Sequence, residues 1–348
     1  MRTFFRIVGK IFAAILGILF VISAILALFF FNLDRRAFSA DTYQQVFAND
    51  GFYNRLPTVL AEALATSSSG QSGFPLVIHG LTAQNWEAFL RAVLPQEVLK
   101  VMGDQALASI FAYVNDQNDT AQLSLAPLKA SLSSESGVQA VYTLLNSQPD
   151  CTFSQIAEMT LSILQQQQQQ IQFCKPSDEL KSLVTPVIQF QLQTTATLLP
   201  DQITIASVDN NPGQTDPRQR LKVVRLVLRL SPILPLGLLL MITLLAVRSL
   251  KSWLIWWGVP FTVTGGVAAM MGFSGAPVAR VILQEILVNN MPTYLPVIML
   301  DYASELSAAM VRQLLEPVVR QGLVLTFLGL AMILFAVLHS RRQALITK

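Results

Sequence analysis

The sequence predicts a mainly α-helical, polytopic membrane protein with four transmembrane helices and a mostly helical extracytoplasmic domain. Three observations predict this class: the apolar composition, the concentration of apolar residues in four uncharged blocks, and the separation of acidic from basic residues along the chain. Of the 348 residues, 52% are hydrophobic and 13% are charged. An ordinary soluble domain has about 25% charged residues, so a soluble class does not fit.

Four blocks without Asp, Glu, Lys or Arg have the length of membrane spans: residues 11–31, 231–247, 253–273 and 322–338. A hydrocarbon core of about 30 Å requires about 20 apolar residues in a helix. The second block is short, but its apolar pattern begins at Leu221, so we expect this helix to extend beyond the bilayer.

The first span could instead be a cleaved signal peptide, because three basic residues precede it. However, its apolar run is longer than the usual stretch of about 7–15 residues. Charged residues 34–36 also follow before any small-residue cleavage site. The sequence therefore favours an uncleaved signal anchor over residues 1–32.

The charges predict the orientation of a multi-pass protein in the cell membrane. All 21 acidic residues lie in segments 34–216 and 285–316, whereas the N-terminus, the link 248–252 and the C-terminal tail hold eight basic residues and no acid. The positive-inside rule predicts cytoplasmic N- and C-termini and an extracytoplasmic large loop. Five basic residues within 218–229 oppose this rule.

The domains expected are residues 1–32 (N-terminus and first span), 33–217 (extracytoplasmic helical domain), 218–273 (second and third spans), 274–321 (extracytoplasmic amphipathic loop) and 322–348 (fourth span and basic tail).

The large loop is expected to be mostly helical, with two short strands. Segments 122–125 and 202–206 alternate polar and apolar residues, which predicts a small two-stranded ribbon. The sequence Asn-Asp-Gly at residues 49–51 predicts a turn. Helical patterns and caps predict helices from Ser39 or Asp41 to 48, over 52–65, from Thr82 or Asn85 to 93, and over 95–114, 127–132, 137–147, 154–164 and 178–199.

Cys151 and Cys174 lie in this loop, where an oxidising compartment would allow a disulfide. Two free thiols are the alternative, because spacing alone does not prove a bond. An unbroken helix over residues 153–173 would hold the cysteines about 34 Å apart. A disulfide requires Cα atoms within about 7 Å. Pairing therefore predicts that a helix beginning near Ser154 ends by about Leu164 and that the chain returns from the Gln run 165–170.

The segment between the third and fourth spans is unusually apolar. It offers an apolar helix over 278–288, two prolines at 292 and 296, and an amphipathic helix over 302–320. Such helices are expected to lie in the membrane interface or to pack against the large loop. A fifth span within 277–300 is the alternative, and its charged residues and prolines disfavour it.

Glycines fall on one face of the third span and on one face of the fourth: Gly258, Gly265 and Gly272, and Gly322 and Gly329. Such faces let helix backbones approach closely. Packing among this chain's own helices is favoured over a dimer face, because three other helices need contacts.

Candidate chemistry is sparse. The four blocks contain no ionisable residue, which argues against a proton-coupled transporter or a charged pore. The chain has two histidines, His79 and His339, and no nucleotide, zinc or nucleophile-elbow motif. We therefore expect no cofactor, metal or catalytic residue, no nucleic-acid partner, and no identifiable small-molecule ligand.

One basic stripe could bind an anion: Arg218, Lys222, Arg225 and Arg229 lie at helical spacings. These side chains could contact anionic headgroups or a polyanion. Anchoring of the helix at the interface is the favoured alternative.

The order of one span, a large outer domain and three spans resembles, in topology, the permease subunits of MacB- and FtsX-type ABC systems. This resemblance implies a permease-like subunit that works with an ATPase. Those permeases carry a charged cytoplasmic stretch after the second span, whereas residues 248–252 here are five residues without an acid. An ATPase would have little to contact.

Two functional hypotheses follow. The favoured one is a non-enzymatic envelope protein that presents its outer domain for sensing, adhesion or complex assembly, with the lipid bilayer and other membrane proteins as partners. The alternative is a permease-like subunit of a transport or lipid-handling system. A membrane enzyme would need acids or histidines clustered at the bilayer surface, which the sequence does not show.

Overall fold

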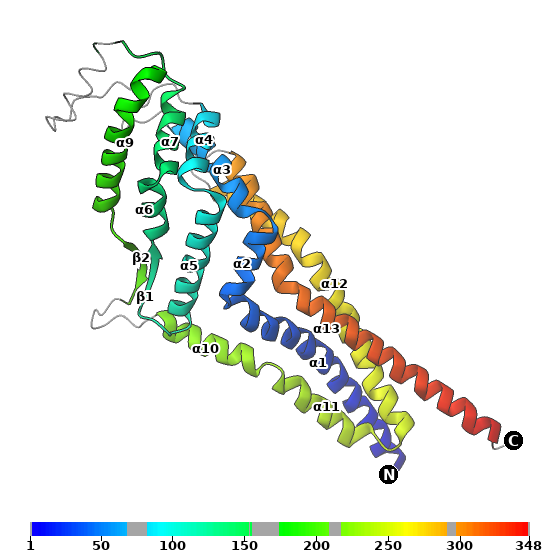
Figure 1. Cartoon of the computed structure of the whole chain (residues 1–348). Coiled ribbons are helices and arrows are strands. Elements are labelled where there is room, and N and C mark those ends of the chain that lie inside the picture. Colours follow the sequence, from blue (N-terminus) through cyan, green and yellow to red (C-terminus); the bar gives the residue numbers. More distant parts are fainter. Residues whose placement is uncertain are drawn as a thin grey trace. The chain divides into compact units, whose positions relative to one another are not determined.

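The computed structural model describes residues 2–67, 82–152, 154, 174–208, 217–290 and 297–346. The chain is mainly helical, as predicted, with one two-stranded sheet in the described part (Figure 1). The elements are α1 (Arg2–Ala37), α2 (Ala40–Asn49), α3 (Phe52–Ser67), α4 (Ala83–Val93), α5 (Gln96–Val114), β1 (Thr120–Ser124), α6 (Ala126–Ser133), α7 (Glu135–Leu145), α9 (Asp178–Leu198), β2 (Gln202–Ser207), α10 (Pro217–Leu230), α11 (Ile233–Ala246), α12 (Leu250–Asn290) and α13 (Val297–Ile346).

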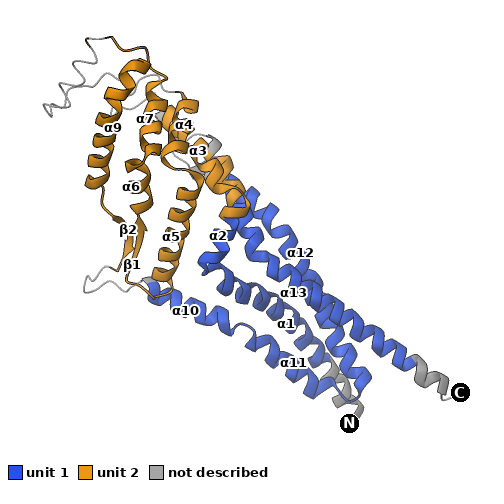
Figure 2. Ribbon diagram, viewed as in Figure 1, with its two compact units in different colours: residues 1–46, 209–285, 307–348 blue, residues 47–208, 286–306 orange. Residues whose placement is uncertain are grey.

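The chain divides into two compact units, which Figure 2 distinguishes by colour. Unit 1 comprises residues 1–46, 209–285 and 307–348. Unit 2 comprises residues 47–208 and 286–306. Each unit is therefore assembled from segments that are distant in the sequence.

Unit 1 carries the membrane-spanning helices. Four helical segments are long and apolar enough to cross a bilayer: Ile11–Ala37, Arg218–Ala246, Leu250–Ile286 and Met299–Ser340. Three of them contain a predicted block whole, and Arg218–Ala246 covers all but the last residue of 231–247, which confirms a polytopic membrane protein. The second segment is interrupted where α10 ends at Leu230 and α11 begins at Ile233. Pro232 lies at this interruption, and proline lacks the backbone N–H that would continue a helix.

The last two helices are longer than their apolar blocks. α12 has 41 residues and α13 has 50, so each is more than 60 Å long at about 1.5 Å per residue. Both exceed a hydrocarbon core of about 30 Å. The segments predicted as separate helices over 278–288 and 302–320 are continuous with the two spans. Pro292 and Pro296 lie outside the described residues.

The core of unit 1 forms where α1 meets α11. Leu16, Phe20 and Ala24 of α1 are buried against Leu239 and Ile242 of α11. Partly buried side chains of α12 pack against this cluster, among them Trp257 and Phe261. The Trp257 indole donates a hydrogen bond to Thr243 Oγ1 at 3.0 Å, which satisfies the polar end of a side chain that packs in apolar surroundings.

α12 and α13 approach each other through the predicted glycine faces. A Cβ atom added at Gly265 would lie 2.4 Å from the carbonyl oxygen of Gly322. One added at Gly329 would lie 2.6 Å from the carbonyl oxygen of Gly258, and one at Gly272 would lie 2.7 Å from the Val319 side chain. The glycines therefore serve packing between two helices of this chain.

Unit 2 has its own core of helices. α3 packs on α4, and α7 packs on α4, α6 and α9. The Thr58 hydroxyl of α3 donates to Glu87 Oε1 of α4 at 2.8 Å, and Arg91 Nε donates to the same oxygen at 2.9 Å. The hydrogen bond from Thr58, and then that from Arg91, lowers the pKa of Glu87. Thr82 caps α4 by accepting from the backbone N–H of Asn85, as its sequence position predicted.

The predicted ribbon is present in unit 2. β1 and β2 pair antiparallel, with Leu123 opposite Ile203 and Gln122 opposite Thr204. A bulge lies between Ala121 and Gln122, and the Gln122 N–H donates to Ser109 Oγ of α5 at 2.8 Å. This contact satisfies a donor beside the irregular point of the ladder and fastens the ribbon to α5.

Cys151 and Cys174 are joined by a disulfide, with their Cα atoms 4.8 Å apart. The Cys151 N–H donates to the Lys175 carbonyl at 2.9 Å, and the Lys175 N–H donates to the Pro149 carbonyl at 2.8 Å. Backbone hydrogen bonds thus hold the two ends of the disulfide loop together. The predicted helix end near Leu164 and the return from the Gln run lie outside the described residues.

The glycine contact between α12 and α13 yields a matched test. Gly265→Ala should destabilise the protein by about 1–3 kcal/mol, because the new methyl group meets backbone atoms that cannot move aside. Gly266→Ala is the control, since an added Cβ at Gly266 meets nothing within 4 Å. Thermal unfolding of both variants in detergent measures the difference. Equal melting temperatures for the two variants would contradict the close contact.

Candidate functional site

Two buried polar residues lie near the end of α1, directly after the first apolar block. Asn32 and Asp34 are each only 4% exposed. Two residues correspond to about 200° around a helix, so the two side chains leave α1 on opposite sides. Because a buried polar or charged group is costly without a partner, each of them needs one.

Asn32 is partnered by Gln321 of α13. Its Nδ2 donates to Gln321 Oε1 at 2.7 Å, and Gln321 Nε2 donates back to Asn32 Oδ1 at 3.3 Å. Asn32 Nδ2 also donates to the Leu28 carbonyl at 2.7 Å. This reciprocal amide pair ties α1 to α13 just before the fourth apolar block begins.

Asp34 is partnered by two arginines of α10. Arg225 Nε donates to Oδ1 at 3.1 Å, and Arg229 Nε donates to Oδ2 at 3.2 Å, so each carboxylate oxygen accepts one charge-assisted bond. The Arg225 guanidinium also lies 4.6 Å from the centre of the Phe38 ring. Arg225 is mostly buried, whereas the Arg229 side chain is 64% exposed.

Together these contacts form a polar belt, which we define as Asn32, Asp34, Arg225, Arg229 and Gln321. The belt joins α1, α10 and α13 at the points where their apolar blocks begin or end. Three spans are therefore aligned at one level, as a bilayer surface requires. At the opposite end of the apolar blocks, α12 begins with three tryptophans, residues typical of the membrane–water interface.

The belt gives two residues of the basic stripe a partner that sequence reasoning missed. Arg225 and Arg229 pair with a carboxylate about 190 residues earlier in the chain. Arg218 is buried, and Lys222 lies one turn before the pairing arginines. A signal was present in the sequence: Asp34 is the first acid after the first span, and the stripe immediately precedes the second span.

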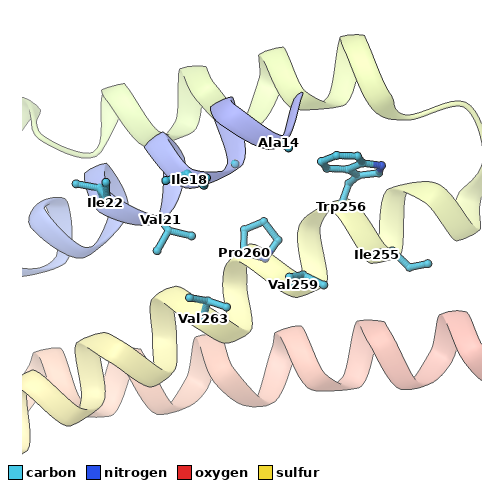
Figure 3. A pocket seen from close by; sticks show the side chains of 10 residues that line it. Ala14, Ile18, Val21, Ile22, Ile255, Trp256, Val259, Pro260 and Val263 are labelled. Carbon is cyan, nitrogen blue, oxygen red and sulfur yellow. The ribbon is translucent and has the colours of Figure 1, made fainter. Parts of the chain in front are cut away.

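An apolar groove lies in unit 1 between α1 and α12, with a volume of 510 Å³. Figure 3 shows side chains from both helices around it. All of its lining residues are apolar: Ala14, Gly17, Ile18, Val21 and Ile22 of α1, and Ile255, Trp256, Val259, Pro260 and Val263 of α12. Sequence reasoning did not find this groove, because it depends on how two helices face each other.

A smaller polar pocket of 230 Å³ lies in unit 2, lined by Asn49, Asp50, Arg55, Tyr302, Glu305 and Leu306. Arg55 pairs with Glu305 at 2.9 Å, and both side chains are largely exposed. The Tyr302 hydroxyl donates to the Phe52 carbonyl at 3.1 Å. An exposed ion pair contributes only about 0–1 kcal/mol to stability. Together with the Tyr302 hydrogen bond, it joins α3 to the start of α13.

The candidate chemistry is otherwise limited. Among the described residues, no group of three or more His, Cys, Asp or Glu side chains could hold a metal ion. The His339 ring stacks on Phe335 at 6.4 Å between ring centres, and His79 lies outside the described residues. The features that stand out are therefore the polar belt and the apolar groove, both in unit 1.

Fold and site together define a polytopic helical membrane protein with a second compact unit formed by residues 47–208 and 286–306. No family model matches the sequence, and neither a curated protein nor a solved structure matches it.

The polar belt can be tested through its carboxylate. Asp34→Asn keeps the shape of the side chain but removes the negative charge that pairs with Arg225 and Arg229. Removing one partner of a fully buried ion pair costs about 3–5 kcal/mol, and the exposure of Arg229 places the expected loss near the lower value. Thermal unfolding in detergent measures the loss.

Asp41→Asn is the matched control, because Asp41 is an exposed carboxylate in the first turn of α2 and its removal should cost less than about 1 kcal/mol. The double variant with Arg225→Gln should lose less than the sum of the two single losses, since both remove the same interaction. Strict additivity would show that the pair does not interact.

Proposed function

We propose that this protein is a non-enzymatic envelope protein that holds unit 2 outside the cytoplasm as a module for assembly with another envelope protein. The observation that carries this proposal is an apolar surface on unit 2. We call it the α9–β2 surface and define it by Leu183, Phe190, Leu198, Ile203 and Ile205, all of which are large, apolar and exposed.

The α9–β2 surface is coherent along the helix. Leu183, Phe190 and Leu198 are 67–80% exposed and follow one another at seven and eight residues. These spacings return to the same side of an α-helix. A soluble surface rarely displays several large apolar side chains together, and such surfaces are typical of protein–protein contact sites.

β2 adds two further exposed apolar side chains. Ile203 and Ile205 are exposed and two residues apart, so their side chains leave the same face of the strand. β2 pairs with β1 along one edge in a two-stranded sheet. A partner could therefore contact both the isoleucines and the second edge of the strand.

Two observations support the location of unit 2 outside the cytoplasm. The Cys151–Cys174 disulfide is typical of an oxidising compartment. The acidic residues of the chain are concentrated in segments 34–216 and 285–316, away from the basic termini. This distribution favours cytoplasmic N- and C-termini.

A permease-like subunit is the second candidate, because the described spans keep the order of one helix, a large unit and three helices. Such a subunit should co-purify with an ATPase and stimulate ATP hydrolysis. The assembly proposal instead expects a stable complex without nucleotide.

The orientation can be tested with single cysteines placed at exposed sites. Ser182→Cys, on α9, should react with a membrane-impermeant maleimide in intact spheroplasts, because unit 2 is expected outside. Ser249→Cys, between α11 and α12, should react only after permeabilisation. Labelling by mass shift on a gel measures both. The reverse pattern would invert the orientation and remove the assembly module from the envelope.

The assembly proposal can be tested by photo-crosslinking in living cells of the source. A photoreactive phenylalanine at Phe190 should give one discrete adduct. The same residue at Val101 on α5, which is also apolar and exposed, serves as the control and should give none. Leu183→Glu with Phe190→Glu should abolish the complex while leaving the melting temperature within a few degrees. An unchanged complex in that double variant would contradict the proposal.

A further inference from the structure

The apolar groove between α1 and α12 lies wholly within the first and third predicted spans, so hydrocarbon surrounds it in a bilayer. Its volume of 510 Å³ falls within the range of about 300–1,000 Å³ that ligand sites occupy. A wholly apolar lining gives no hydrogen bond to a polar molecule, but it suits a hydrocarbon chain (Figure 3).

Small side chains on α1 keep the groove open. Gly17 lies in its wall, and an added Cβ atom there meets nothing within 4 Å. Ala14, one turn earlier, also leaves space. In contrast, Phe20 lies about one turn after Gly17 on α1. Its ring centre lies 5.9 Å from that of Phe261 on α12. The two helices are therefore in contact beside the groove, and the groove is a local feature of their packing.

Two basic side chains, Lys251 and Arg248, precede the α12 residues that line the groove. Lys251, Ile255, Val259 and Val263 follow one another at four-residue steps on α12, which places them along one side of the helix. The last three line the groove, and Lys251 is exposed one turn before them. Arg248 is also exposed, in the turn that precedes α12.

From this arrangement we propose that the groove binds one acyl chain of an anionic phospholipid, whose phosphate contacts Lys251 and Arg248. The apolar lining selects the chain, and the two cations at its end select the negative headgroup. Trp256, in the wall nearest the cations, is of the type that lies at the headgroup level. The lipid comes from the leaflet on the side of the α11–α12 turn. This site does not depend on the proposed assembly role of unit 2.

The proposal can be tested by native mass spectrometry of the full-length protein. The delipidated protein in detergent is titrated with dioleoyl phosphatidylglycerol or dioleoyl phosphatidylcholine. We expect one phosphatidylglycerol retained per chain in clear preference to phosphatidylcholine. Lys251→Gln and Arg248→Gln should each weaken retention of phosphatidylglycerol about fivefold and leave that of phosphatidylcholine unchanged.

The groove itself is tested by filling it. Gly17→Leu places a side chain in the open space and should abolish retention. Gly266→Leu is the matched control, because Gly266 also has open space, lies on α12 and does not line the groove. Ala14→Leu is a second filling variant that decides the matter if Gly17→Leu does not fold, as judged by gel filtration and melting temperature.

Three outcomes would overturn the proposal. The first is wild-type retention in a folded groove-filling variant. The second is equal retention of the two lipids together with no effect of either charge substitution. The third is a dimer that Gly17→Leu disrupts, which would make a second copy of this chain the occupant of the groove.

Discussion

The arrangement of unit 1 depends on the carboxylate of Asp34. It is almost completely buried at the end of the first span, and a buried charge without a partner would be too costly to retain. Arg225 and Arg229 satisfy it and thereby fix α10 against α1. The amide pair of Asn32 and Gln321 fixes α13 on the opposite side. α1 is thus held between two neighbours by polar contacts at the end of its apolar block.

Small residues have two opposite consequences within the same unit. Where Gly265 and Gly322 face each other, the backbones of α12 and α13 come into direct contact and no space remains. Where Gly17 of α1 lines the groove, an added Cβ atom meets nothing within 4 Å, and the α12 residues that line the same groove include Val259 and Pro260. Glycines therefore form a close contact between α12 and α13 and leave open space between α1 and α12. The apolar groove is the result of a mismatch between two helix faces.

Unit 2 is stabilised differently, because it has an ordinary apolar core together with a disulfide. Val138, Leu144 and Leu145 of α7 are buried, and Cys151 is joined to Cys174 a few residues beyond that helix. α9 contributes a buried Ala196, whereas its Leu183, Phe190 and Leu198 side chains remain exposed. One side of α9 thus packs on α6 and α7, while these three large apolar side chains remain available to a partner.

The sequence by itself determined the features that depend on neighbouring residues. The absence of charge over about 20 residues predicted each span, alternation predicted the ribbon of β1 and β2, and capping residues predicted the start of α4 at Thr82 or Asn85, of which Thr82 is the cap. These signals are local, since hydropathy, period and capping are properties of one stretch of chain. Only the tertiary structure decided that Asp34 pairs with Arg225 and Arg229, that α12 and α13 continue beyond their apolar blocks, and that α1 and α12 enclose a groove. Each of these depends on how two helices are rotated about their axes relative to each other or on how far a helix continues, and no pattern within a single helix specifies the facing side chains of another.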